Sequence, residues 1–143
     1  MRSDRPPPRA RGSEKEVLLG FLDYLRASIA AKVEGVAEPQ VRTPGVPSGT
    51  NLLGLVNHLT YVERATFLGE RVTDWQATFH ADPGDTVDDV LAAYRDATAR
   101  ANEVIGPITP SLRWALTHLI EETGRHAGHA DILRELIDGT TGR

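Results

Sequence analysis

The segment SLRWALTHLIEETGRHAGHADILRELIDG, residues 111–139, decides the fold. Apolar residues return along it every three or four positions, which is the spacing of an amphipathic α-helix. Thr109 is placed to cap this helix and Pro110 to occupy its first position, where a missing N–H costs nothing. Gly139 follows in the usual stop position, so the sequence predicts a helix over about residues 111–137. Its apolar face comprises Leu112, Ala115, Leu116, Leu119, Thr123, Ala130, Leu133 and Ile137.

Three further segments show the same periodicity. The first covers residues 13–35, where Ser13 and Glu16 have the spacing of a capping box. The second covers residues 51–69, and the third covers residues 86–105. No stretch alternates apolar and polar residues long enough to indicate a strand. The sequence therefore predicts an all-α protein, a four-helix bundle.

The length of 143 residues suits one domain. Hydrophobic residues make up 40% of the chain and charged residues 25%, as in ordinary globular proteins with a packed core. Residues 1–12 differ, because they contain three consecutive prolines and four arginines with almost nothing apolar. Such a segment cannot bury enough surface to offset the entropy of ordering. We therefore expect a flexible N-terminal arm over residues 1–12 and a single bundle domain over residues 13–143.

Composition also excludes several functions. The net charge of −4 argues against a nucleic acid partner, because phosphate binding needs clustered, uncompensated Lys and Arg. The chain has no cysteine, so disulfides, thiolate metal sites and a cysteine nucleophile are ruled out, and thiol chemistry would need an external thiol. No apolar run is long enough to cross a membrane, and the N-terminus has no signal-peptide core. We expect a cytoplasmic protein without a membrane partner.

Three polar residues point toward the predicted core. At about 100° per residue, His126 falls inside the apolar face of its helix and Glu122 lies near the edge, close to Leu119. The two are four positions apart, so they stand on adjacent turns and can share one ion. His58, on the second helix, flanks the apolar stripe beside Leu55. A divalent cation would satisfy the carboxylate and both imidazoles at once, which makes these three residues candidate metal ligands.

Spacing alone leaves a simpler interpretation open. Glu122 could pair with Arg113 or Arg125 at the rim of the bundle, and each histidine could form an ordinary hydrogen bond. A Glu and a His four positions apart on a helix are a weak motif.

The other histidines have separate interpretations. His129 is one turn beyond His126 and could shuttle a proton at a metal-bound water, which makes it the candidate catalytic residue. His118 is expected at the surface or the rim of the site. His80 lies in a predicted loop and is expected to be solvated.

Two segments, PSGTNLLGLVNHLTYVER (residues 47–64) and the segment at residues 111–139, resemble the DinB-like superfamily, specifically its actinobacterial branch of uncharacterised function. The first predicted helix fits that branch too. The resemblance implies an up-down-down-up bundle in which His58, Glu122 and His126 bind zinc or nickel. Many relatives have His at the position of Glu122, whereas mycothiol-dependent maleylpyruvate isomerase, a relative, is similar to this chain in having Glu there.

The resemblance also implies function. Enzymes of the superfamily include transferases and isomerases that use mycothiol or bacillithiol, and a homodimer is the expected assembly. The first hypothesis is a metal-dependent S-transferase that joins such a thiol to a small electrophile. The second is a metal-assisted hydrolase in which Glu122 or His129 handles the proton. The third is a non-enzymatic, stress-related binding or dimerisation module whose metal is structural or absent.

Overall fold

The computed structural model describes residues 4–9 and 11–142 of the chain. Its helices, in chain order, are α1 (Glu14–Val33), the 3-10 helix η1 (Gln40–Arg42), α2 (Leu52–Phe67), the 3-10 helix η2 (Ala77–Phe79), α3 (Val87–Val104) and α4 (Pro110–Asp138). The described residues contain no strand. The predicted all-α fold is confirmed, and every predicted helix end agrees with the structure to within two residues. The two short 3-10 helices lie in segments predicted as loops.

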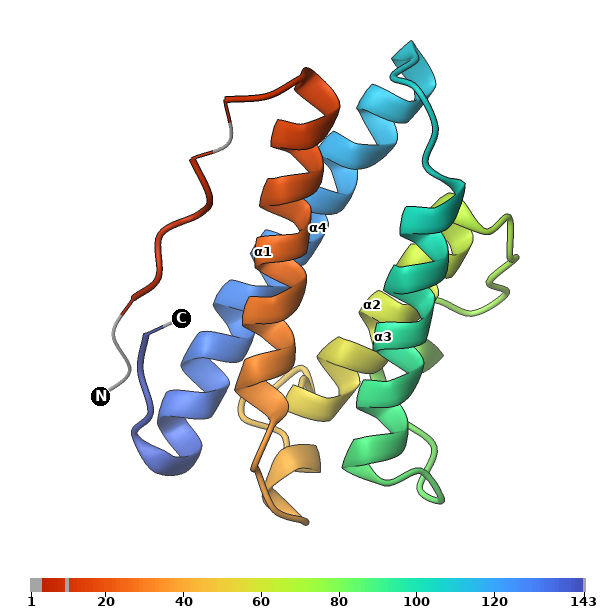
Figure 1. Ribbon diagram of the computed structural model, residues 1–143. Helices are drawn as coiled ribbons and strands as arrows, with labels where there is room; N and C mark the ends of the chain where they lie inside the picture. The colour runs from red at the N-terminus through yellow and green to blue at the C-terminus, as the bar shows by residue number, and fades with distance from the viewer. Residues whose placement is uncertain (1–3, 10, 143) are drawn as a thin grey trace.

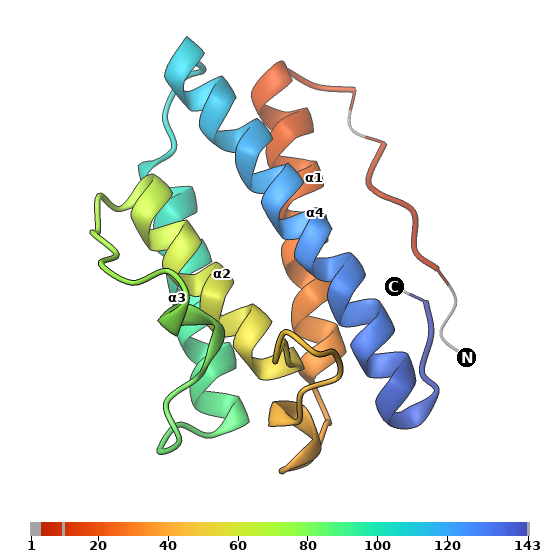
Figure 2. The ribbon, with the colours of Figure 1, turned by 180° about the vertical axis from the view of Figure 1, so that it is seen from behind.

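The four α-helices form a bundle in which α1 packs against α4 and α2 packs against α3 (Figure 1). α1 and α4 run in one direction, while α2 and α3 both run in the other (Figures 1 and 2). The parallel pair α2 and α3 is joined by a long connection, residues 68–86, which returns the chain to the starting end of α2. This order is the up-down-down-up topology that the resemblance implies.

The helices that matter most for the site, α2 and α4, have well-defined starts. The Asn51 side chain accepts a hydrogen bond of 2.8 Å from the Gly54 N–H and so caps α2. Thr109 caps α4 through the Leu112 N–H at 3.1 Å, and Pro110 occupies the first helical position, as predicted. Gly139 ends α4 at φ 75°, a left-handed conformation that favours glycine. These caps fix the residue at which each helix begins, and so the height along the bundle at which its site residues lie.

The core lies between the four helices and is mainly aliphatic. Its largest fully buried apolar side chains include Leu22, Ile29, Leu52, Leu53, Leu55, Leu59, Leu116 and Leu119. One ion pair interrupts it, because Arg26 of α1 donates to both carboxylate oxygens of Glu63 of α2, at 2.7 and 2.6 Å. Both side chains are buried. The sequence did not predict this pair.

The described part of the N-terminal arm, residues 4–9 and 11–12, has no helix or strand and extends beside α1 (Figure 1). The Tyr24 hydroxyl of α1 donates a hydrogen bond to the Arg5 carbonyl. The division into an arm and one bundle domain stays a prediction. No helix among the described residues combines the length and the apolar character needed to cross a bilayer.

Candidate metal centre

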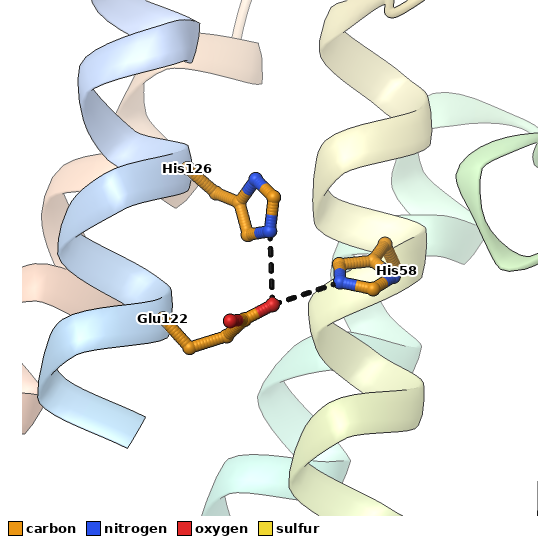
Figure 3. A group of neighbouring side chains, drawn as sticks. All are labelled: His58, Glu122 and His126. Carbon is orange, nitrogen blue, oxygen red and sulfur yellow. Dashed lines mark hydrogen bonds and ion pairs between the residues drawn. The ribbon is translucent and has the colours of Figure 1, made fainter. Parts of the chain in front are cut away.

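The structure brings His58, Glu122 and His126 together between α2 and α4 (Figure 3). His58 Nε2 lies 3.1 Å from Glu122 Oε1, and His126 Nε2 lies 3.0 Å from the same oxygen. One candidate ligand atom from each residue lies within 4.8 Å of the other two. Both imidazoles are buried, while the carboxylate is partly exposed. The three residues that the helical phases pointed inward therefore do meet at one place.

The rim pairing that the sequence left open for Glu122 does not occur. Arg113 instead pairs with Glu14 of α1, and Arg125 lies 3.9 Å from Glu121 on its own helix. Glu122 is left with the two imidazoles as its partners.

The His58 ring is oriented by the connection between α2 and α3. Its Nδ1 lies 2.8 Å from the Thr78 hydroxyl, and that hydroxyl donates its one proton to the Trp75 carbonyl at 2.6 Å. The hydroxyl must therefore accept from His58, so Nδ1 carries the ring hydrogen. Nε2 then presents a lone pair toward Glu122, as a metal-ligating imidazole does.

The segment that orients His58 fits against α2 because residue 54 is a glycine. A Cβ at Gly54 would lie 1.9 Å from the Phe79 carbonyl oxygen, so no other residue allows this approach. With the backbone this close, the Phe79 ring stacks on the His58 ring with centroids 3.9 Å apart and planes 11° apart. The sequence predicted a loop here and missed Trp75, Thr78 and Phe79. The signal that could have found them is Gly54 inside a helix, one turn before His58.

His126 is held differently from His58. Its Nδ1 is buried and has no hydrogen-bond partner among the described residues. Its ring instead makes edge contacts with the rings of His58 and Phe79, at centroid distances of 4.9 and 5.8 Å. His126 therefore has no hydrogen bond at Nδ1 like the one that orients His58, and packing holds that side of its ring while Nε2 faces Glu122.

The charges at the centre follow from burial. Burial lowers the pKa of His58 and the pKa of His126, against the opposing effect of Glu122. Burial acts to raise the pKa of Glu122, but the adjacent His58 and His126 imidazoles outweigh it, so that pKa is lowered. Near neutral pH the centre therefore holds two neutral imidazoles and one carboxylate.

A divalent cation fits this donor set. A neutral His58 with its hydrogen on Nδ1 directs a lone pair at a carboxylate oxygen 3.1 Å away, and these two atoms repel each other unless a cation binds both. Two donors bound to zinc at about 2.0–2.1 Å with tetrahedral angles lie roughly 3.3 Å apart, close to the observed separations of 3.0 and 3.1 Å. Two imidazoles and one carboxylate also leave a coordination position open, as in catalytic zinc sites.

The remaining histidines lie around the centre. The His129 ring is 5.6 Å from the His126 ring but is exposed and lines a separate cavity of about 180 Å³ beside Ser48 and Thr50. His118 lines a larger cavity of about 560 Å³ that also reaches His58 and Glu122. His80 is exposed in the connection between α2 and α3, as predicted.

Comparison with known proteins identifies one family. The family model described as Mycothiol-S-transferase matches residues 17–139, which is most of the chain. No curated protein and no solved structure matches the chain significantly. The matched range contains all four helices except the first residues of α1, and it contains the three residues of the candidate metal centre.

Proposed function

The chain belongs to the mycothiol-S-transferase family, a DinB-like family, and from that premise we propose that it is a metal-dependent enzyme that transfers mycothiol to a small electrophile. The observation that carries the metal part of the proposal is the lone pair of His58 Nε2, which Thr78 directs at Glu122 beside His126. The family match supports the proposal that the transferred group is the thiol mycothiol. The absence of cysteine agrees with a thiol supplied from outside the chain.

Each residue of the centre has one proposed role. His58, Glu122 and His126 would hold zinc or nickel, and the ion would lower the pKa of a bound thiol so that its sulfur is a thiolate near neutral pH. Because its pKa is lowered, Glu122 stays a carboxylate and serves as a charged ligand rather than as an acid. The rings of Phe79 and Trp75 pack against His58, whose side chain is buried.

The proposed transfer is a substitution at carbon. The thiol sulfur forms a bond to the electrophilic carbon, the leaving group departs with the bonding electron pair, and the thiol proton goes to water. The chain's contribution beyond the ligands is the cavity of about 560 Å³ beside His58 and Glu122, which is large enough for a small molecule.

Transfer activity tests the proposal directly. We expect the zinc- or nickel-loaded protein to accelerate conjugation of mycothiol with chloroacetamide, measured by mass spectrometry, above the rate with His58→Ala. Bacillithiol in place of mycothiol tests thiol preference. Acceleration equal to that of His58→Ala would overturn the transferase. Hydrolysis of the electrophile without any thiol would favour the metal-assisted hydrolase, and a metal-free protein indifferent to the substitution would favour the binding module.

Orientation of His58 by Thr78 gives a second expected result. Thr78→Val removes the hydroxyl that fixes the ring hydrogen on Nδ1, so zinc affinity should fall by about 10- to 100-fold, the usual effect of losing such an outer partner. The measurement is competition with a chromogenic chelator. Thr60→Val is the matched control. Thr60 is buried like Thr78 but lies on α2, and its hydroxyl donates to the Val56 carbonyl of its own helix. Equal zinc affinity in the two variants would contradict the role of Thr78.

Three expectations from the sequence stay predictions. They are the choice between zinc and nickel, the homodimer and the proton-shuttling role of His129. For His129 the structure gives a specific difficulty, since this residue lies in a different cavity from the one that reaches His58 and Glu122.

A further inference from the structure

The cavity beside the metal centre has an unusual lining. Its volume of about 560 Å³ lies in the range of small-molecule sites. His58 and Glu122 line it, together with Trp75 from the connection before α3 and Trp114 from α4. The chain has two tryptophans in all, and both line this cavity. The largest aromatic surfaces of the protein are thus gathered next to the proposed reaction site.

The tryptophans are also unusually exposed. Trp114 is 66% exposed and Trp75 is 43% exposed, although both have large apolar rings that are usually well buried. The His118 ring stacks on Trp114 with centroids 4.9 Å apart and planes 20° apart. Flat rings that line a cavity and remain open to solvent can stack on a planar ligand.

The charges around the cavity limit the chemical class of ligand that it can bind. None of the described residues that line it is a lysine or an arginine. Its ionisable side chains are His58, Glu122 and His118, and the remaining walls are mainly apolar. An anionic electrophile would find no cationic side chain to offset its lost hydration, and the charge of the proposed ion would already be balanced by Glu122 and the bound thiolate. A large polyhydroxylated ligand would find few hydrogen-bond partners, since Thr66, His118 and the two indole N–H groups are the polar side-chain groups beyond the two candidate ligands.

We propose that this cavity binds the electrophile, and that it takes a planar, uncharged aromatic compound against Trp114. The assignment of the ligand as the electrophile rests on the proposed transferase function, whereas its chemical class rests on the cavity. Trp114 supplies the stacking surface, and His118 holds the indole in place. The reactive carbon then lies toward His58 and Glu122.

Binding of an unreactive probe tests this without any thiol. The probe is 1,3-dinitrobenzene, which is planar, uncharged and lacks a leaving group. Because both tryptophans line the cavity, quenching of the intrinsic fluorescence reports its occupancy, and Trp75 continues to report in Trp114→Ala. We expect Trp114→Ala to weaken binding about 5- to 10-fold, as loss of one aromatic stacking contact does. Leu136→Ala is the matched control, because Leu136 lies on the same helix and is 67% exposed but does not line the cavity.

Two related compounds and a second variant sharpen the test. 3,5-Dinitrobenzoate, an anion, and nitrocyclohexane, which is not planar, should both bind the metal-free protein more weakly than the probe. Ala115→Phe should block binding, because Ala115 lines the cavity and the new ring would occupy it. Absent binding of the probe, equal binding by Trp114→Ala, or equal binding of the three compounds would overturn the proposal. None of these results bears on transfer to chloroacetamide, so failure here is distinguishable from failure of the transferase function.

Discussion

Arg26→Met is expected to lower the free energy of unfolding by roughly 3–5 kcal/mol, the usual effect of removing one partner of a buried ion pair. The Arg26 guanidinium donates to both oxygens of Glu63, at 2.7 and 2.6 Å, and the Glu63 side chain is fully buried. Without Arg26, the carboxylate would remain in the core with no compensating charge. Urea denaturation at pH 7 measures the loss.

The pH dependence of this variant separates lost charge compensation from lost packing. Burial raises the pKa of Glu63, whereas the hydrogen bonds and the charge of Arg26 act to lower it. In Arg26→Met burial acts without that opposition, so the folded carboxyl keeps a proton that the unfolded chain releases near pH 4.5. The folded state then binds more protons than the unfolded state, and stability falls as the pH rises from 5 to 8. We therefore expect a larger loss relative to wild type at pH 8 than at pH 5.

Two controls accompany this prediction. The double variant Arg26→Met, Glu63→Leu removes both charges and should recover most of the stability, because an apolar pair of similar volume is often as stable as a buried ion pair. Arg113→Met changes an exposed pair with Glu14 and should have little effect. A loss in Arg26→Met that is independent of pH and persists in the double variant would contradict the account.

The helices could be predicted because their signals are local. Periodicity, the capping residues Ser13, Thr86 and Thr109, and the stop at Gly139 all act within one or two turns, and the structure uses each of them. The Arg26–Glu63 pair could not be predicted in this way. Its members are 37 positions apart on different helices, and their meeting depends on how α1 and α2 are rotated against each other.

The same distinction between local signals and contacts between distant residues applies to the site. The inward direction of His58, Glu122 and His126 follows from helical phase, and the resemblance joined the three into one centre. Thr78 and Phe79 were missed because a connection without periodicity gives no indication of which helix it will cover. On a helical wheel His118 and His129 both lie near Glu122 in angle, so the wheel alone does not tell which of them shares a cavity with it. They differ along the axis, His118 being four residues before Glu122 and His129 seven after it, and this difference puts them in different cavities.

His58→Ala is expected to weaken zinc binding by more than about 100-fold, which exceeds the usual effect of losing an outer partner of a ligand. The substitution removes the imidazole whose lone pair is fixed toward Glu122 by Thr78. Competition with a chromogenic chelator gives the affinity. Thermal unfolding gives an independent readout, because a ligand that binds the folded state raises the melting temperature in proportion to the logarithm of its concentration over its dissociation constant. Zinc should therefore stabilise the wild type and leave His58→Ala unchanged.

Glu122 decides whether these measurements report a metal centre or a hydrogen-bonded triad. Glu122→Gln keeps the shape and one acceptor oxygen but removes the charge, so a triad held by hydrogen bonds would tolerate it, whereas zinc affinity should fall as it does in His58→Ala. Glu122→His restores a strong donor and should recover binding. His80→Ala removes an exposed imidazole that is not part of the cluster of candidate ligands and should bind zinc like the wild type. If Glu122→Gln kept the zinc affinity of the wild type, the carboxylate would be a partner of the two imidazoles and not a ligand, because only coordination requires its charge.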